Sequence, residues 1–165
     1  MKIAVCYSGF LREVIDSFPD TSEKFSFNDH DCDFFLHTWK HETEYKNELK
    51  YFIENIKPKS WLVDTPRPFE EHPYYYGNRV NTNWDELTPE KFDKTTHSYA
   101  GNLATYPHNV LSQYYSKHMV NQLRKSYCSM VDKKYDLVIS LRSDIYFNEK
   151  INYNEVDFNN VNTVW

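Results

Sequence analysis

Apolar residues along this chain follow two alternating patterns. Short runs rich in β-branched and aromatic side chains predict strands, and between them apolar residues recur every three or four positions, as in amphipathic helices. Strands are expected at 2–7, 33–38, 60–64 and 135–141, and helices at 10–18, 42–56 and 109–130, the first two ended by Pro19 and Pro58. Strands that alternate with helices favour a parallel sheet with right-handed crossovers. We therefore expect an α/β fold with a mostly parallel central sheet.

Two stretches interrupt this alternation. Between 65 and 107 the chain is rich in proline and asparagine and has no period, apart from a short helix expected at 88–92. After the last predicted strand, 145–147 is expected to continue the extended run, and 161–165 to begin another strand. The organisation predicted is one domain, 1–165, with an irregular excursion at 65–107.

The predicted strand at 135–141 leads directly into charged residues. Its continuous apolar run, 137–139, indicates a central strand buried on both faces, and Arg142 and Asp144 follow it. Ligands of open α/β sheets bind outside the carboxyl ends of the strands. A carboxylate there can hold Mn²⁺ or Mg²⁺, and an arginine can neutralise phosphate. The alternative is that the two side chains pair with each other and close the strand.

The end of the first strand offers a second candidate site. Ser8 and Gly9 follow this strand, and Arg12 comes three residues after Gly9. Glycine lets a backbone approach a ligand closely, the following helix offers free N–H groups to phosphate, and arginine can pair with a diphosphate. The spacing matches neither a Walker A loop nor a dinucleotide glycine motif. An ordinary strand-to-helix turn with a surface arginine is the alternative.

The second and third strands also end in polar residues. Asp64 ends the third strand and can accept hydrogen bonds from a base or ribose, although an aspartate that starts a turn before Pro66 is equally consistent. His37 and Trp39 end the second strand, where a ring can pack against a base. For these two rings a structural role is the better interpretation.

Composition narrows the class of protein. The chain has 165 residues and a net charge of -5, without a Lys/Arg stripe, which argues against nucleic acid as a partner. Its cysteines, Cys6, Cys32 and Cys128, are odd in number and form no Cys-x-x-Cys pair, so reduced thiols of a cytoplasmic protein are expected. No segment approaches the ~20 apolar residues of a membrane span, so no transmembrane segment is expected.

Four segments together resemble small GT-A-type glycosyltransferases, and the likeness is greatest to viral and bacterial proteins linked to surface-glycan synthesis. The segments are KIAVCYSGFLR at 2–12, DFFLHTW at 33–39, NVLSQYYSKHMVNQL at 109–123 and KYDLVISLRSDIYF at 134–147. The resemblance implies a Rossmann-like α/β/α sandwich that forms a single nucleotide-sugar-binding domain. It also implies a nucleotide-diphosphate sugar as donor, a glycan as acceptor, and Mn²⁺ or Mg²⁺ as cofactor.

The resemblance also implies roles for single residues. Those placed at the nucleotide are Tyr7, Ser8, Gly9, Arg12, Asp64 and Arg142. The segment Arg142–Asp144 takes the place of the family's Asp-x-Asp metal motif, with arginine at the first position. Two expectations follow: Asp144 binds the metal alone, or Arg142 partly substitutes for the metal.

The expected function is transfer of a sugar from a nucleotide-diphosphate sugar to a glycan or other hydroxyl acceptor. GT-A enzymes normally continue past the metal motif into an acceptor-binding half, whereas this chain ends at Trp165, so a donor-binding portion or a minimal version is expected and no catalytic base is assigned. Two alternatives stay open. One is another phosphate-handling transferase, and the other is a non-catalytic nucleotide- or glycan-binding module with a degenerate site.

Overall fold

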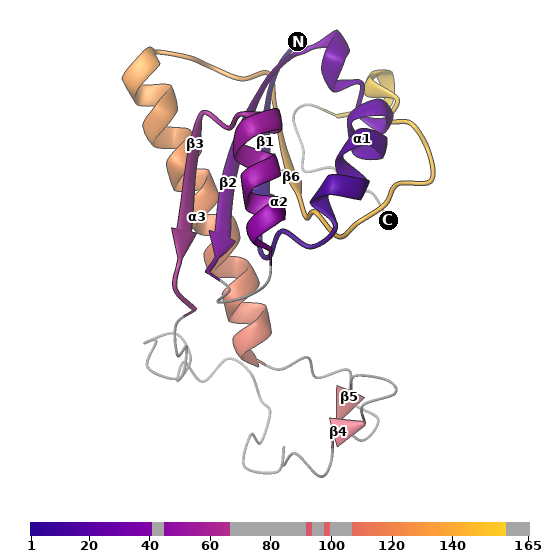
Figure 1. Ribbon diagram of the computed structural model, residues 1–165. Helices are drawn as coiled ribbons and strands as arrows, with labels where there is room; N and C mark the ends of the chain where they lie inside the picture. The colour runs from indigo at the N-terminus through magenta and orange to yellow at the C-terminus, as the bar shows by residue number, and fades with distance from the viewer. Residues whose placement is uncertain (41–44, 67–91, 94–97, 100–106, 158–165) are drawn as a thin grey trace. The chain divides into compact units, whose positions relative to one another are not determined.

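The computed structural model describes residues 1–40, 45–66, 92–93, 98–99 and 107–157 (Figure 1). Of residues 92–93, 98–99 and 107–111 it describes the backbone only. The chain forms two compact units, Met1–Thr65 with Ser116–Trp165, and Pro66–Tyr115. All the site residues predicted from the sequence belong to the first unit.

The first unit is built on a four-stranded parallel sheet. Its strands are β1 (Lys2–Ser8), β2 (Asp31–Trp39), β3 (Ser60–Asp64) and β6 (Leu137–Leu141), in the order β3-β2-β1-β6. The chain steps from β1 to β2 and β3 in one direction and returns to the other side of β1 for β6, so the strand order reverses beside β1. The α/β fold with a parallel sheet is confirmed.

Helices lie on both faces of this sheet (Figure 1). Successive side chains of a strand point to opposite faces. In β1, Ile3, Val5 and Tyr7 join the core beneath helices α1 (Val14–Lys24) and α2 (Lys46–Tyr51), the latter continued by the π-helical turn η2 (Phe52–Ile56). Ala4 and Cys6 pack instead against Val120 of α3 (Pro107–Val131). Two-sided burial explains why β1 is apolar from Ile3 to Tyr7.

The first helix differs from the prediction at both ends. Phe10 and Leu11 have helical spacing but precede α1, which begins at Val14 and continues through Pro19 to Lys24. Leu11 is nevertheless buried in the core, and this burial accounts for its place in the apolar pattern. Pro19 does not end the helix, because the residues buried on one face of α1 lie both before and after the proline and hold the helix against the sheet. These residues are Val14, Ser17 and Thr21.

The other two helices are confirmed in the described residues, with one difference in the buried face. Residues 42–44 lie outside the described part, and Lys57 ends η2 in the left-handed conformation just before Pro58. In α3, Tyr114 and Met130 of the predicted apolar stripe are 68% and 83% exposed, and Ser116 is buried instead. The face of the sheet beneath α3 carries the small side chains of Ala4 and Cys6 beside Phe35. A small residue such as Ser116 on α3 lets the helix approach this face closely.

The strand β6 is not central within the described part of the chain. It pairs with β1 on one edge only, and Val138 is 46% exposed, so the prediction of burial on both faces is wrong. The chain turns at Ser143 and Asp144 rather than continuing as a strand at 145–147. Phe147 then packs edge-on against Phe25, with ring centroids 4.8 Å apart. The apolar run at 137–139 therefore indicates that β6 contacts the core on one face only.

The remaining described elements are short. Two 3-10 turns, η1 (Phe27–Asp29) and η6 (Tyr153–Glu155), flank the α1 side of the first unit, and the second unit holds an antiparallel pair, β4 (Phe92–Asp93) with β5 (Ser98–Tyr99). Of the short helix expected at 88–92, only Phe92 is described, and it lies in β4; the strand expected at 161–165 lies outside the described residues. Among the helices described, none has the length and apolar character that crossing a membrane needs.

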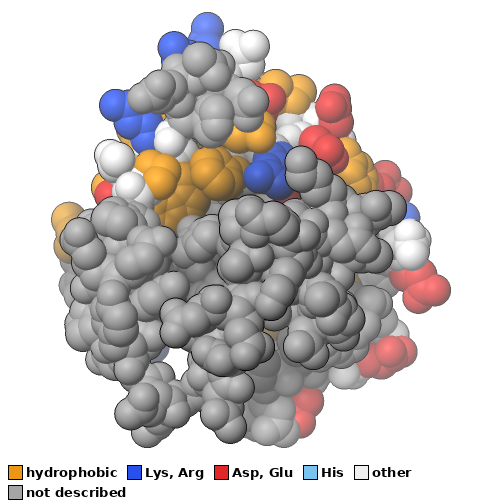
Figure 2. All heavy atoms as spheres, turned by 90° about the horizontal axis from the view of Figure 1, so that it is seen from below, with side chains coloured by type: hydrophobic (Ala, Val, Ile, Leu, Met, Phe, Trp, Pro, Cys, Tyr) orange, Lys and Arg blue, Asp and Glu red, His pale blue; other side chains and the backbone are white. Residues whose placement is uncertain are grey.

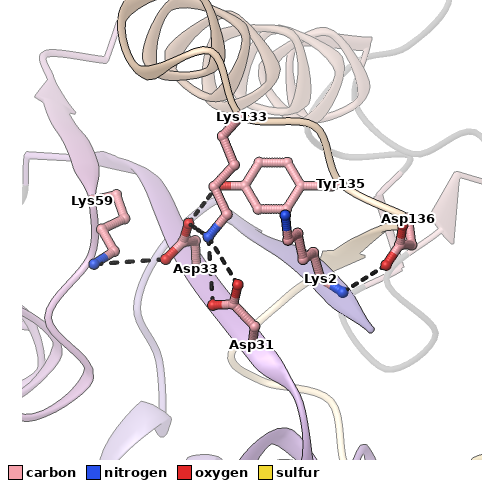
Figure 3. Close-up of polar contacts among 7 residues, drawn as sticks. All are labelled: Lys2, Asp31, Asp33, Lys59, Lys133, Tyr135 and Asp136. Carbon is pink, nitrogen blue, oxygen red and sulfur yellow. Dashed lines mark hydrogen bonds and ion pairs between the residues drawn. The ribbon is translucent and has the colours of Figure 1, made fainter.

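A polar network closes the amino-terminal edge of the sheet (Figure 3). The Asp33 carboxylate accepts hydrogen bonds from Lys133 Nζ at 2.7 Å and Tyr135 Oη at 2.6 Å, and Lys59 Nζ lies 3.6 Å away. Burial alone would raise the pKa of Asp33, but these hydrogen bonds and cations hold it below its usual value. The network fastens the segment between α3 and β6 to β2.

Candidate functional site

The candidate site lies at the opposite edge of the sheet, where all four strands end. We call this edge the carboxyl rim and define it as Ser8–Arg12 after β1, Asp64 at the end of β3, and Arg142–Asp144 after β6. The edge is shared because the strands are parallel, with Ser8 in register with His37. Figure 2 views the molecule from the side toward which the strand arrows of Figure 1 point, and described basic, acidic and hydrophobic side chains lie side by side there.

The turn after β1 depends on Gly9. Its φ of +101° is one that side-chain-bearing residues rarely adopt. Its N–H donates to Ser116 Oγ at 2.8 Å and to His37 O at 3.2 Å. A Cβ at this position would meet no described heavy atom within 4 Å. Hydrogen bonds therefore fix the Gly9 backbone on its N–H side, and the side where a Cβ would lie is open.

Arg142 and Asp144 form a bidentate ion pair. Arg142 Nε donates to Asp144 Oδ1 at 2.8 Å, and Nη2 donates to Oδ2 at 2.6 Å. These hydrogen bonds lower the pKa of Asp144 and raise the pKa of Arg142. Arg12 also lowers the pKa of Asp144, so the guanidinium groups after β1 and β6 lie within electrostatic range of one carboxylate.

Ser143, between the two charged residues, fastens this pair to the turn after β1. It is 3% exposed, and its Oγ donates to Phe10 O at 3.0 Å. Its carbonyl oxygen accepts a hydrogen bond from Ser17 Oγ of α1 at 2.6 Å. The sequence reasoning missed both serines. A small polar residue at a buried helical position, as at Ser17, was the signal that could have found one of them.

Tyr7 lies apart from the charged groups of the rim. Its side chain is 2% exposed and packs edge-on against Phe52, with ring centroids 5.2 Å apart. Burial raises the pKa of its hydroxyl. Its odd-numbered position in β1 directs it into the core beneath α2, so the ring serves packing in this structure.

Asp64 and His37 lie on neighbouring strands of the rim. Asp64 Oδ2 is 3.9 Å from His37 Nε2, and Asp64 Oδ1 accepts from the N–H of Thr65 at 2.9 Å, as an aspartate that starts a turn does. His37 is fully buried, with its ring edge-on to Trp39 at 5.0 Å. Its structural role fits the interpretation favoured from the sequence.

Ser116, His37 and Asp64 have the residue types of a hydrolase triad, but their arrangement cannot serve that chemistry. Ser116 Oγ lies 2.8 Å from His37 Nδ1. Both Ser116 and His37 are 0% exposed, so a substrate carbonyl has no access to the hydroxyl. A nucleophile must reach the reacting atom to act. The three residues are therefore part of the framework of the rim.

The predicted metal ligand Asp144 is paired with Arg142 in this structure. Both of its oxygens accept hydrogen bonds from Arg142, whose positive charge would repel a cation. Within the described ranges, no three histidine, cysteine or acidic side chains gather in a way that would hold a metal ion. A Mn²⁺ or Mg²⁺ ion at Asp144 would compete with Arg142 for the carboxylate.

No protein-family model, no curated protein and no solved structure matches this chain. The resemblance to GT-A glycosyltransferases thus stays a prediction from short segments. The chemistry of the carboxyl rim is then the guide to function.

Proposed function

We propose that this protein is a nucleotide-sugar-dependent glycosyltransferase, or the donor-binding portion of one, with a Rossmann-like sandwich of the GT-A type. The observation that carries the proposal is the hydrogen bond from Ser143 Oγ to Phe10 O, which joins the turn that carries Arg12 to the Arg142–Asp144 pair at the rim beside β1. Open α/β sheets bind ligands outside the carboxyl ends of their strands, where the strand order reverses. Two guanidinium groups beside an open glycine turn suit a diphosphate.

Each group has a distinct task in donor binding. The backbone at Gly9 lets the diphosphate approach, and the exposed Arg12 pairs with its oxygens. Arg142 directs Nε and Nη2 at Asp144, and no contact among the described residues uses Nη1, which is then available to phosphate. Asp64, at the end of β3, is the residue we assign to the ribose or base.

The transfer step needs only charge stabilisation from these groups. An acceptor hydroxyl attacks the anomeric carbon of the sugar, the bond from that carbon to the diphosphate oxygen breaks with its electron pair on the diphosphate, and the hydroxyl proton passes to water. The cations of Arg12 and Arg142 stabilise the negative charge that develops on this leaving group. Asp144 acts as a positioning residue that orients Arg142, and no step runs through a metal.

A thermal-shift experiment tests donor binding. UDP, GDP, ADP and dTDP are each added with and without Mn²⁺, and at least one is expected to raise the melting temperature of the wild type. Arg12→Ala should abolish most of this rise. Arg124→Ala is the matched control, because Arg124 hydrogen-bonds only Asn121 of its own helix among the described residues. A flat response to all the nucleotides would contradict the proposal.

One observation favours a second candidate function, a non-catalytic nucleotide- or glycan-binding module. In this structure Arg142 occupies both oxygens of Asp144, where the GT-A resemblance implies carboxylates for a metal. Hydrolysis of nucleotide-diphosphate sugars, lost in Asp144→Ala, would indicate an enzyme. Nucleotide binding without turnover in the wild type would indicate the module.

A further inference from the structure

We propose that Ser116, on α3, is the positioning residue of the carboxyl rim: one buried hydroxyl fixes the Gly9 turn and the His37 ring together. The inference rests on the proposed function, because the Gly9 turn is where the diphosphate would bind. It assigns a role in the site to a helix that contributes no charged group to the rim.

The contacts of Ser116 Oγ show how one atom can hold two strands. It lies 2.8 Å from the Gly9 nitrogen, 2.8 Å from His37 Nδ1 and 3.3 Å from His37 O. A hydroxyl has one proton and two lone pairs. It accepts from the Gly9 N–H, and its proton goes either to Nδ1 or to the His37 carbonyl, with Nδ1–H donating to the second lone pair in the latter case. The second arrangement uses the proton and both lone pairs, whereas the first leaves one lone pair unused.

The same contacts link the two ends of the proposed nucleotide site. Gly9 follows β1, where the diphosphate would lie, and His37 belongs to β2. The Nε2 atom of His37 lies 3.9 Å from Asp64 Oδ2, at the end of β3. Ser116 thus holds both the proposed phosphate-binding turn and an imidazole ring that lies beside the carboxylate assigned to the ribose or base.

The turn needs such a partner because of its own flexibility. Glycine has more backbone freedom than any other residue, and no side chain at Gly9 restricts the turn. A buried hydrogen bond from a packed helix orders the N–H before ligand arrives. Ordering in advance raises affinity by removing that cost from binding.

The test compares two variants that each remove one hydroxyl group engaged in hydrogen bonds. Ser116→Ala removes the contacts at the carboxyl rim, whereas Tyr135→Phe removes the 2.6 Å bond to Asp33 at the opposite edge. Both should lower the melting temperature. Affinity for UDP and for inorganic pyrophosphate, measured by calorimetry, should fall about tenfold in Ser116→Ala and stay within about twofold of wild type in Tyr135→Phe. If Ser116→Ala does not fold, Ser116→Cys replaces it, since it keeps the volume and weakens the acceptor.

Exchange of the Gly9 amide proton with solvent gives a readout that needs no ligand. It should be faster in Ser116→Ala and unchanged in Tyr135→Phe. Wild-type affinity in Ser116→Ala, equal weakening in both variants, or unchanged Gly9 exchange would each overturn the positioning role. A wild type that binds neither probe would instead overturn the proposed function.

Discussion

At the scale of single residues, the Arg142–Asp144 pair decides what the rim can bind. The two side chains are 40% and 20% exposed, so solvent screens the pair and its contribution to stability is small. Its significance lies in orientation, because a bidentate pair fixes the plane of the guanidinium group. The pair also determines whether Asp144 is available to a cation.

Arg142→Ala should therefore have two opposite effects. Metal-free UDP binding should weaken about tenfold, because one charge-assisted contact to phosphate is lost. Mn²⁺ should raise the melting temperature more than in the wild type, because the Asp144 oxygens are released. Calorimetry and thermal shift measure the two effects, with Arg124→Ala as control. Unchanged metal-free affinity would show that Arg142 does not meet the diphosphate.

Asp33 is the buried carboxylate at the centre of the network at the amino-terminal edge of the sheet. Its side chain is 4% exposed, whereas Lys133 and Lys59 are 19% and 47% exposed, so losing its charge should cost less than the ~3–5 kcal/mol typical of breaking a fully buried pair. Asp33→Asn is expected to lower the free energy of unfolding by an amount below this range, measured in urea at pH 7. Asp136→Asn is the control, since Asp136 is exposed at the same edge and accepts a hydrogen bond from the Lys2 N–H at 2.7 Å.

The effect of Asp33 should also depend on pH. The folded state lowers the pKa of Asp33, so its contribution is complete above the unfolded value of about 3.9 and is lost as the pH falls through the lower folded value. The difference between wild type and Asp33→Asn should therefore shrink as the pH falls below about 4. A difference that stays constant down to pH 2 would contradict the assignment.

At the scale of elements, α1 contains an avoidable defect. Pro19 lies inside the helix, cannot donate to the carbonyl of Ile15, and is exposed, so it contributes little packing. Pro19→Ala restores the hydrogen bond, while the unfolded chain becomes more flexible and offsets part of the gain. A net stabilisation of about 1–2 kcal/mol is expected from these two terms.

Chemical denaturation measures this gain, and nucleotide affinity should not change. Asp16→Ala alters another exposed residue of α1 without adding a backbone donor, and it should stay within about 0.5 kcal/mol of wild type. Equal stability of Pro19→Ala and wild type would mean that the proline costs the helix nothing.

The strands and helices were the most predictable elements, for a physical reason. A sheet covered on both faces favours unbroken apolar runs in its inner strands, and residues 3–7 of β1 and 34–36 of β2 show such runs in the sequence. The start of α1 was not predictable in the same way. Phe10 and Leu11 have helical spacing, yet they form a loop, and Leu11 is apolar because it fills the core.

The candidate site was likewise predictable only in part. Parallel strands end at the same edge of a sheet, so the sequence predicts that Arg12 and Asp144 lie at one edge. The supporting contacts of Ser116 and Ser143 join residues 107 and 133 positions away along the chain, and no local pattern indicates such pairs. A buried serine in a helix or after a strand has the same sequence appearance whether or not it holds a turn.

At the scale of the whole first unit, the two ends of the sheet differ in what they do. The amino-terminal edge holds the compensated charges around Asp33, and the carboxyl rim holds the open glycine turn and the arginines (Figures 1 and 3). The variants above place their stability effects at one end and their binding effects at the other. Tyr135→Phe and Arg142→Ala should therefore combine additively in both measurements.

This separation has a consequence for how the protein can change. New ligand preferences would arise through substitutions at Arg12, Asp64 or Arg142, none of which takes part in the Asp33 network. A library randomised at these three positions should consequently retain a large share of folded members, and selection for a different substrate could proceed before any compensating mutation is acquired.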